Sequence, residues 1–186
     1  MNNPYSITKD CAERFAWMFN KEHGVKISVV RALNAYGPRQ RSRPVRKIIP
    51  NFILPALKGE DLIVYGDGTQ VMDMIWVGDV AKILVQALLV DHGQYTYEPV
   101  SSDVLPPVFE AGSGVPTTVA EIADLVINCA GSSSKIRYVP MRPGEPPKSV
   151  VVGNPETLRP LFEGKIPELV PLEEGIALTI KAMAEE

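Results

Sequence analysis

Predicted strands and predicted helices alternate along most of the chain, and this order constrains the fold more than any other feature. Apolar runs rich in β-branched residues predict strands at residues 25–33, 61–65, 72–77, 107–111 and 135–140. Apolar side chains spaced three or four residues apart predict helices at residues 5–22, 48–59, 80–90 and 119–130. This alternation is typical of an α/β fold.

Local signals mark several of the element ends. Asp79 is the predicted N-cap of the third helix, and Thr118 with Glu121 forms a predicted capping box before the fourth. The strand at 25–33 is predicted to be mostly buried, and residues 34–47 to form a loop. From residue 155 onward, short helical segments are predicted to alternate with proline breaks.

The first predicted element is a helix, whereas a nucleotide-binding α/β domain opens on a strand and a Gly-rich turn. The chain has two Gly-rich turns, YGDG at 65–68 and AGSGVP at 111–116. Neither matches G-x-G-x-x-G, and neither opens a unit with an acidic residue about 20 positions further on. The sequence therefore contains no dinucleotide-binding fingerprint.

Composition narrows the class of protein. The 45% hydrophobic content and near-zero mean hydropathy are typical of a soluble globular protein. A net charge of -3 gives no reason to expect nucleic acid or an acidic membrane as partner. Cys11 and Cys129 lie in apolar helical patterns, which predicts reduced, buried thiols, and no spacing of His, Cys or Asp suggests a metal site. We therefore expect a cytoplasmic protein without a metal.

Tyr5 and Lys9 are four residues apart, so they share one face of the first helix. A phenol with a pKa near 10 is a poor base at neutral pH, but a neighbouring ammonium stabilises the phenolate and lowers that pKa. The pair is thus suited to proton transfer. The same spacing also occurs as a simple surface pair, so the pair does not establish chemistry by itself.

The Tyr5–Lys9 pair belongs to the first of six segments that follow one another along the chain: PYSITK, RALNAYGPRQ, VYGDGTQ, MDMIWVGDV, EAGSG and MRPGE. Together they resemble the C-terminal portion of extended short-chain dehydrogenase/reductases, the NAD-dependent nucleotide-sugar epimerases and dehydratases. The resemblance runs from Pro4 to the LEEGIALTI of the last predicted helix.

The resemblance implies roles for five residues. Tyr5 would be the general acid/base at a sugar hydroxyl, and Lys9 would hold the nicotinamide ribose of NAD and lower the tyrosine pKa. Asn34 and Arg142 would contact the diphosphate of a nucleoside-diphosphate sugar, and Glu145 would accept hydrogen bonds from its ribose. From the residues alone, Asn34 making a local turn and a solvated loop around Arg142 and Glu145 remain alternatives.

The chain also departs from the family pattern. The family commonly has an arginine for the diphosphate where this sequence has Met72, and a thioether cannot pair with phosphate. The basic run RQRSRPVRK at 39–47 either compensates for this loss or is simply solvated.

The resemblance also implies an architecture. We expect the C-terminal part of a Rossmann-like parallel sheet with a small mixed α/β substrate-binding region, the N-terminal dinucleotide-binding half being absent. Residues 1–47 would carry the catalytic helix, the last sheet strand and the following loop, and residues 48–186 the substrate-binding region. Such a piece exposes apolar surface, so we expect a homodimer or association with an N-terminal half.

Three functions stay open at this point. The chain could be part of an epimerase or dehydratase that is inactive alone, a nucleotide-sugar-binding module without redox chemistry, or a non-catalytic assembly partner. Epimerase, dehydratase and decarboxylase are not distinguished by these residues, and neither are the sugar and the base.

Overall fold

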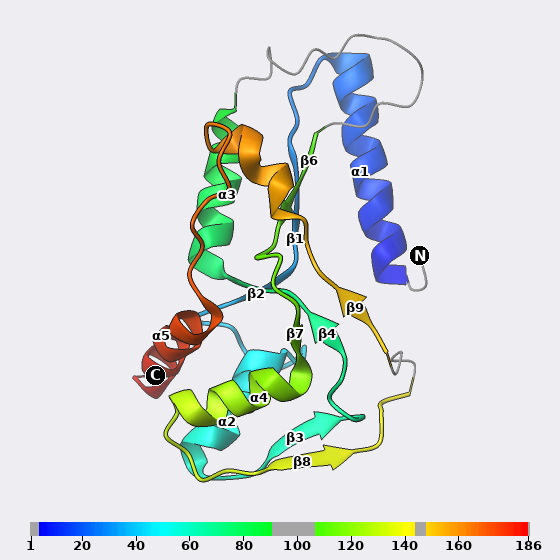
Figure 1. Cartoon of the computed structure of the whole chain (residues 1–186). Coiled ribbons are helices and arrows are strands. Elements are labelled where there is room, and N and C mark those ends of the chain that lie inside the picture. Colours follow the sequence, from blue (N-terminus) through cyan, green and yellow to red (C-terminus); the bar gives the residue numbers. More distant parts are fainter. Residues whose placement is uncertain (1–3, 91–106, 144–147, 186) are drawn as a thin grey trace.

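The computed structural model describes residues 4–90, 107–143 and 148–185, and its helices and strands alternate as predicted (Figure 1). The helices are α1 (Pro4–His23), α2 (Ile48–Lys58), α3 (Val77–Leu89), α4 (Val119–Cys129), the 3₁₀ helix η1 (Pro155–Leu161) and α5 (Leu172–Ala184). The strands are β1 (Val29–Ala32), β2 (Asn34–Tyr36), β3 (Leu62–Tyr65), β4 (Val71–Met72), β5 (Met74–Trp76), β6 (Val108–Ala111), β7 (Thr117–Thr118), β8 (Ile136–Val139) and β9 (Val150–Val151).

A parallel pair of strands, β1 and β6, forms one end of the molecule, with α3 on one side and α1 on the other (Figure 1). Apolar side chains of α3, β5, β6 and η1 bury one another there in a hydrophobic cluster that includes Ile75, Ile83, Phe109 and Leu158. This cluster holds the β1–β6 pair in place, and β2 follows directly after β1.

The other end is built on a second parallel pair, β3 and β8 (Figure 1). Helices α2 and α4 pack on β3, and α5 packs on α2 and α4. Its core includes Ile49, Ile53, Leu62, Ile122 and Ile176, all fully buried. Such side chains contribute roughly 1.5–3 kcal/mol each relative to an exposed position. The predicted capping box at the start of α4 is confirmed, since the Thr118 hydroxyl and the Glu121 carboxylate cap each other's backbone N–H.

Short strands connect these two ends. β2 pairs in parallel with β5, and β4 lies between β7 and β9 (Figure 1). The parallel pairs β1–β6 and β2–β5 both join the segment before residue 48 to the segment after it. Strand pairing thus crosses the predicted boundary between residues 47 and 48, and the division into two regions stays a prediction.

Helix α1 is attached to the sheet by charge. Glu13 accepts two hydrogen bonds from the Arg31 guanidinium of β1, at 2.8 and 2.6 Å, and these bonds lower the pKa of Glu13. No α1 residue in the described structure is buried. The prediction of a buried Cys11 is therefore wrong: both cysteines are free, but Cys11 is exposed on this uncovered helix.

The prediction for residues 25–47 was wrong in two respects. The strand is limited to β1, and it is only partly covered because β6 is its one strand partner among the described residues. Residues 34–36, expected in a loop, form β2 because their backbone bonds to β5.

Asp79 is not the N-cap of α3, as the sequence suggested. The helix begins directly after β5, with Trp76 as N-cap, so Asp79 lies inside its first turn. Its buried carboxylate accepts from the Val170 backbone N–H at 2.7 Å and from Lys82 at 3.2 Å. Asp79 thus links α3 to the segment before α5.

The close packing of α5 on β2 gives a testable prediction at Gly175. A methyl group there would overlap the Tyr36 hydroxyl and lie 2.8 Å from the ring carbon that carries it. Exchanging glycine for alanine within a helix normally stabilises by about 1 kcal/mol. For Gly175→Ala we instead expect a loss of about 1–3 kcal/mol in urea unfolding, from overpacking. Tyr36→Phe in the same chain should relieve part of that loss, and a stabilising Gly175→Ala would contradict this packing.

Candidate functional site

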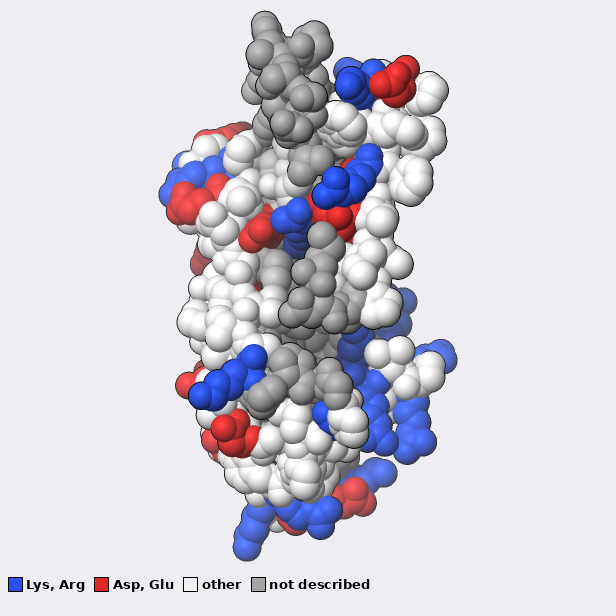
Figure 2. Space-filling view, turned by 90° about the vertical axis from the view of Figure 1, so that its right-hand side faces the viewer, with Lys and Arg blue, Asp and Glu red and all other residues white. Residues whose placement is uncertain are grey.

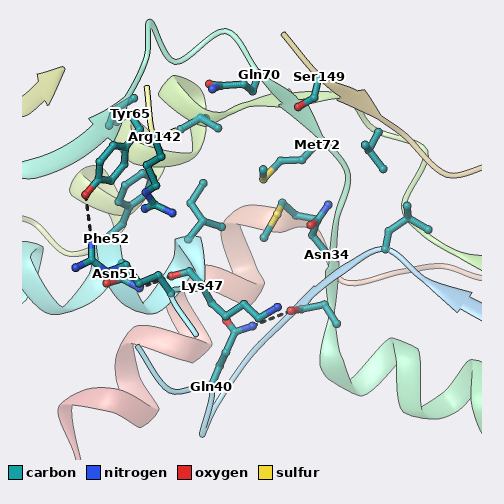
Figure 3. Close-up of a pocket in the computed structure, with 18 of the residues that line it drawn as sticks. Asn34, Gln40, Lys47, Asn51, Phe52, Tyr65, Gln70, Met72, Arg142 and Ser149 are labelled. Carbon is teal, nitrogen blue, oxygen red and sulfur yellow. Dashed lines mark hydrogen bonds between the residues drawn. The ribbon is translucent and has the colours of Figure 1, made fainter. Parts of the chain in front are cut away.

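A pocket of about 1000 Å³ lies where the connecting strands meet α2 (Figure 3). Side chains from α1, α2, α4, β1, β2, β3, β4, β5 and β9 line it, together with the loop between β2 and α2 and Arg142 after β8. This volume suits a small-molecule ligand. The described residues that line it include no Asp and no Glu.

Tyr5 reaches the pocket from the first turn of α1. Its side chain is 71% exposed, and the Lys9 ammonium lies 5.5 Å from the centroid of its ring. The structure therefore brings the predicted pair together on one helix face beside the cavity. A ligand in the pocket would therefore lie beside the Tyr5 hydroxyl. The catalytic role of Tyr5 and Lys9 stays a prediction.

Asn34 lies in the pocket where β1 passes into β2. Its backbone N–H and its side-chain amide both donate to the backbone carbonyl of Asp73, at 3.2 and 3.0 Å. An amide NH₂ carries two hydrogens, so this contact orients the group and leaves one hydrogen for a ligand. The amide of Asn34 thus bonds to a residue 39 positions away, and its contact with a substrate stays a prediction.

Asp73 holds this region together from behind the pocket, and sequence reasoning missed it. Its fully buried carboxylate accepts from the backbone N–H and hydroxyl of Ser113 at 2.8 and 2.6 Å. It also accepts from the backbone N–H groups of Gly114 at 2.8 Å and Gly153 at 3.0 Å. The available signal was one carboxylate within the apolar run MDMIWV, because a buried charge requires such partners.

Arg142 also lines the pocket, while its predicted contact with a diphosphate stays a prediction. Its guanidinium carbon lies 3.9 Å from the centroid of the Tyr65 ring, close enough for a cation–π contact. Arg46 approaches the same tyrosine and donates to its hydroxyl at 3.0 Å. Glu145, the third predicted substrate contact, lies outside the described residues.

Met72 lines the pocket from β4, so the position where the family commonly has an arginine presents an apolar side chain to the cavity. Arg43, Arg46 and Lys47 of the basic loop line the same cavity, and their compensation for Met72 stays a prediction. In the part of the chain that the structure describes, no three His, Cys, Asp or Glu residues are grouped to hold a metal. No helix among the described residues is long and apolar enough to cross a membrane.

Comparison with known proteins decides the family. The model of the NAD dependent epimerase/dehydratase family matches residues 1–97. The chain belongs to this family. A curated relative, UDP-glucuronic acid decarboxylase 1 of Danio rerio, is 31% identical over 183 residues, which is 98% of this chain and 39% of the relative. A putative UDP-glucose 4-epimerase of Methanocaldococcus jannaschii is 30% identical over 77% of this chain and 42% of the relative.

Solved structures agree with this assignment. UDP-glucose 4-epimerase of Thermotoga maritima, solved with UDP-glucose, has a TM-score of 0.78 and 30% identity, over 98% of this chain and 53% of that one. UDP-N-acetylglucosamine 4-epimerase of Methanobrevibacter ruminantium, solved with UDP-N-acetylmuramic acid, has a TM-score of 0.81 and 26% identity over similar shares, 98% and 54%. The chain thus spans about half the length of these family members or less. The predicted family and α/β fold class are confirmed.

Proposed function

We propose that this chain supplies the nucleotide-sugar pocket and the acid–base pair of an NAD-dependent epimerase or dehydratase, and that it is inactive without a cofactor-binding half. One observation carries the proposal: Tyr5 opens onto the same cavity as a group of cations. A proton-transfer group and an anion-binding wall in one pocket suit a sugar joined to a diphosphate.

Asn34 and Arg142 are the proposed contacts to the diphosphate. The second amide hydrogen of Asn34 is available to a phosphate oxygen, and the planar fork of Arg142 suits a pair of anionic oxygens. Glu145 is proposed to accept from ribose hydroxyls. The 1000 Å³ cavity is large enough for such a ligand.

The proposed cofactor is NAD, which when bound would accept a hydride from the sugar carbon. Residues of this chain fit only its nicotinamide end: Tyr5 and the exposed Lys9 lie together at the pocket, and the sequence has no Gly-rich phosphate loop. Tyr5 would take the proton of the sugar hydroxyl. Lys9 would bind the ribose and favour the phenolate form of the tyrosine.

The proposed protein partner is a second copy of the chain or a separate N-terminal half. Helix α1 exposes Ile7, Phe15 and Phe19, which are 50%, 62% and 46% accessible. Strand β1 uses one edge for β6 among the described strands. Both features leave surface for another protein to cover. We place this chain and its protein partner in the cytoplasm, where the free thiols of Cys11 and Cys129 stay reduced.

A binding module without redox chemistry is the second candidate. The exposure of Tyr5 favours it, because a reacting tyrosine is normally enclosed with its cofactor. In this case the pocket would bind the nucleotide sugar, and the tyrosine would not take part in chemistry.

Calorimetry separates these functions. We expect UDP-glucose to bind the chain alone, and NAD to bind only when a protein carrying the cofactor-binding half is added. Binding of UDP-glucose without NAD in that mixture would favour the binding module. Binding of neither ligand would leave the role of assembly partner and overturn the proposal.

A further inference from the structure

The Tyr5–Lys9 pair belongs to a longer row of polar side chains on α1. Glu13 follows Lys9 by four residues, so Tyr5, Lys9 and Glu13 share one face of the helix. At 1.5 Å per residue, Glu13 lies about 12 Å along the helix axis from Tyr5. A rotation of α1 by one residue, about 100°, would turn the whole row to another direction. A contact that holds Glu13 therefore also sets the direction of Tyr5.

Glu13 is held by two directional bonds. Nε and Nη2 of Arg31 donate to its two carboxylate oxygens, at 2.8 and 2.6 Å. A guanidinium and a carboxylate joined in this way have a fixed relative orientation. The Glu13 side chain is only 17% exposed, so salt screens this pair less than a pair on the open surface. Because no α1 residue in the described structure is buried, packing constrains the rotation of this helix less than that of a core helix.

Arg31 is itself fixed on the sheet. It lies on β1 opposite Glu110 of β6, and its Nη1 is 3.9 Å from one oxygen of that carboxylate. The other oxygen accepts from the backbone N–H of Asn154, between β9 and η1, at 2.9 Å. Strand β9 lines the pocket through Val151. Figure 2 looks onto the side of the molecule where α1 lies, and acidic and basic side chains lie next to one another in the upper part of that face.

We infer that Glu13 and Arg31 are positioning residues: their two-bond link sets the rotation of α1, and so holds Tyr5 and Lys9 toward the pocket. The link acts through orientation, so it need not contribute much to stability. The inference rests on the proposed function of Tyr5 and Lys9 and adds two residues that act through them.

Spin labels test the orientation of α1 in the chain alone. Cys11 is exposed and lies two residues from Glu13, on the far side of the helix, so a label there leaves the link intact. Asp124→Cys places the second label at an exposed position of α4, and Cys129→Ser removes the other natural thiol. The distance between the two labels is then measured by pulsed electron paramagnetic resonance.

Arg31→Met removes the link and keeps an unbranched side chain. We expect a broader distance distribution or one displaced by about 5 Å, since a one-residue rotation moves a side chain by at least the helix radius. Arg14→Met is the matched control, because Arg14 pairs with Asp10 within α1 at 2.8 Å and does not reach the sheet. Its distribution should equal that of the wild type. Glu13→Met should act like Arg31→Met, and the double variant should go no further, because each exchange breaks the same link.

Kinetics test what the orientation does. In an enzyme reconstituted with a cofactor-binding half, Arg31→Met should lower kcat by roughly 10- to 100-fold, the effect of misplacing a reacting group by about 1 Å. The dissociation constant of UDP-glucose should change little, because neither Glu13 nor Arg31 is among the described residues that line the pocket. Damage to the fold would change both quantities. Arg31→Lys, which keeps the charge without the planar fork, should recover part of kcat.

The outcomes separate this inference from the proposed function. Equal distance distributions for Arg31→Met and Arg14→Met would overturn the inference, whether or not the reconstituted enzyme is active. A displaced helix with wild-type kcat would overturn it as well. If Arg31→Met displaces the helix but the wild-type preparation neither binds UDP-glucose nor turns over, the proposed function fails, and the link keeps its role in orienting α1.

Discussion

Asp73→Asn should destabilise the chain by about 3–5 kcal/mol, the range measured when one partner of a buried charged network is removed. The fully buried carboxylate accepts four hydrogen bonds, from Ser113, Gly114 and Gly153. An amide of the same shape replaces one acceptor oxygen with a donor. That NH₂ would face backbone N–H groups, and their hydrogen bonds would be lost with no water to replace them. The measurement is the free energy of unfolding in urea, followed by circular dichroism.

Asp67→Asn is the matched control for this experiment. The Asp67 carboxylate likewise accepts hydrogen bonds from a backbone N–H and a hydroxyl, both of Thr69, but it lies on an exposed turn. The same exchange there should change the free energy of unfolding by less than about 1 kcal/mol. Equal losses at both positions would show that the Asp73 network does not hold the segments together.

Tyr5→Phe should lower turnover by about 10²- to 10⁴-fold in an enzyme reconstituted with a cofactor-binding half, the usual contribution of a general acid or base. The exchange removes only the hydroxyl, so the ring still lines the pocket. The dissociation constant for UDP-glucose should therefore change little, and the loss should appear in kcat. Steady-state kinetics together with calorimetry on the same preparation measures both quantities.

Tyr138→Phe gives the comparison for that result. Tyr138 lies on β8, is 51% exposed and is not among the residues that line the pocket. Its removal should leave turnover unchanged. Wild-type turnover in Tyr5→Phe would mean that another group moves the proton, and the assignment carried by the Tyr5–Lys9 spacing would be wrong.

The sequence predicted the elements that have strong local signals. Helix α1 follows from its apolar spacing, and α4 from the reciprocal capping of Thr118 and Glu121, because these signals involve residues one turn apart. Strand β2 was missed because its three residues have no pattern of their own and are extended through their pairing with β5. Asp79 was misassigned because its partner, Val170, is 91 residues away.

In the candidate site too, contacts between residues close in sequence could be predicted, and contacts between distant residues could not. Tyr5 and Lys9 are one helical turn apart, so their proximity could be predicted from spacing. The orientation of Asn34 depends on a carbonyl 39 residues away in β4–β5, and the meeting of Arg46 with Tyr65 depends on how α2 packs on β3. Sequence spacing contains no information about such contacts, so these arrangements required the fold.

The Glu13–Arg31 link has a consequence for how the tyrosine is presented. An ion pair that is partly exposed is worth about 0–1 kcal/mol. Since no α1 residue in the described structure is buried, this pair is one of the contacts that set the angle at which Tyr5 meets the cavity. A protein seated on the apolar side of α1 would add its own contacts to this helix and would hold Tyr5 more firmly toward the pocket.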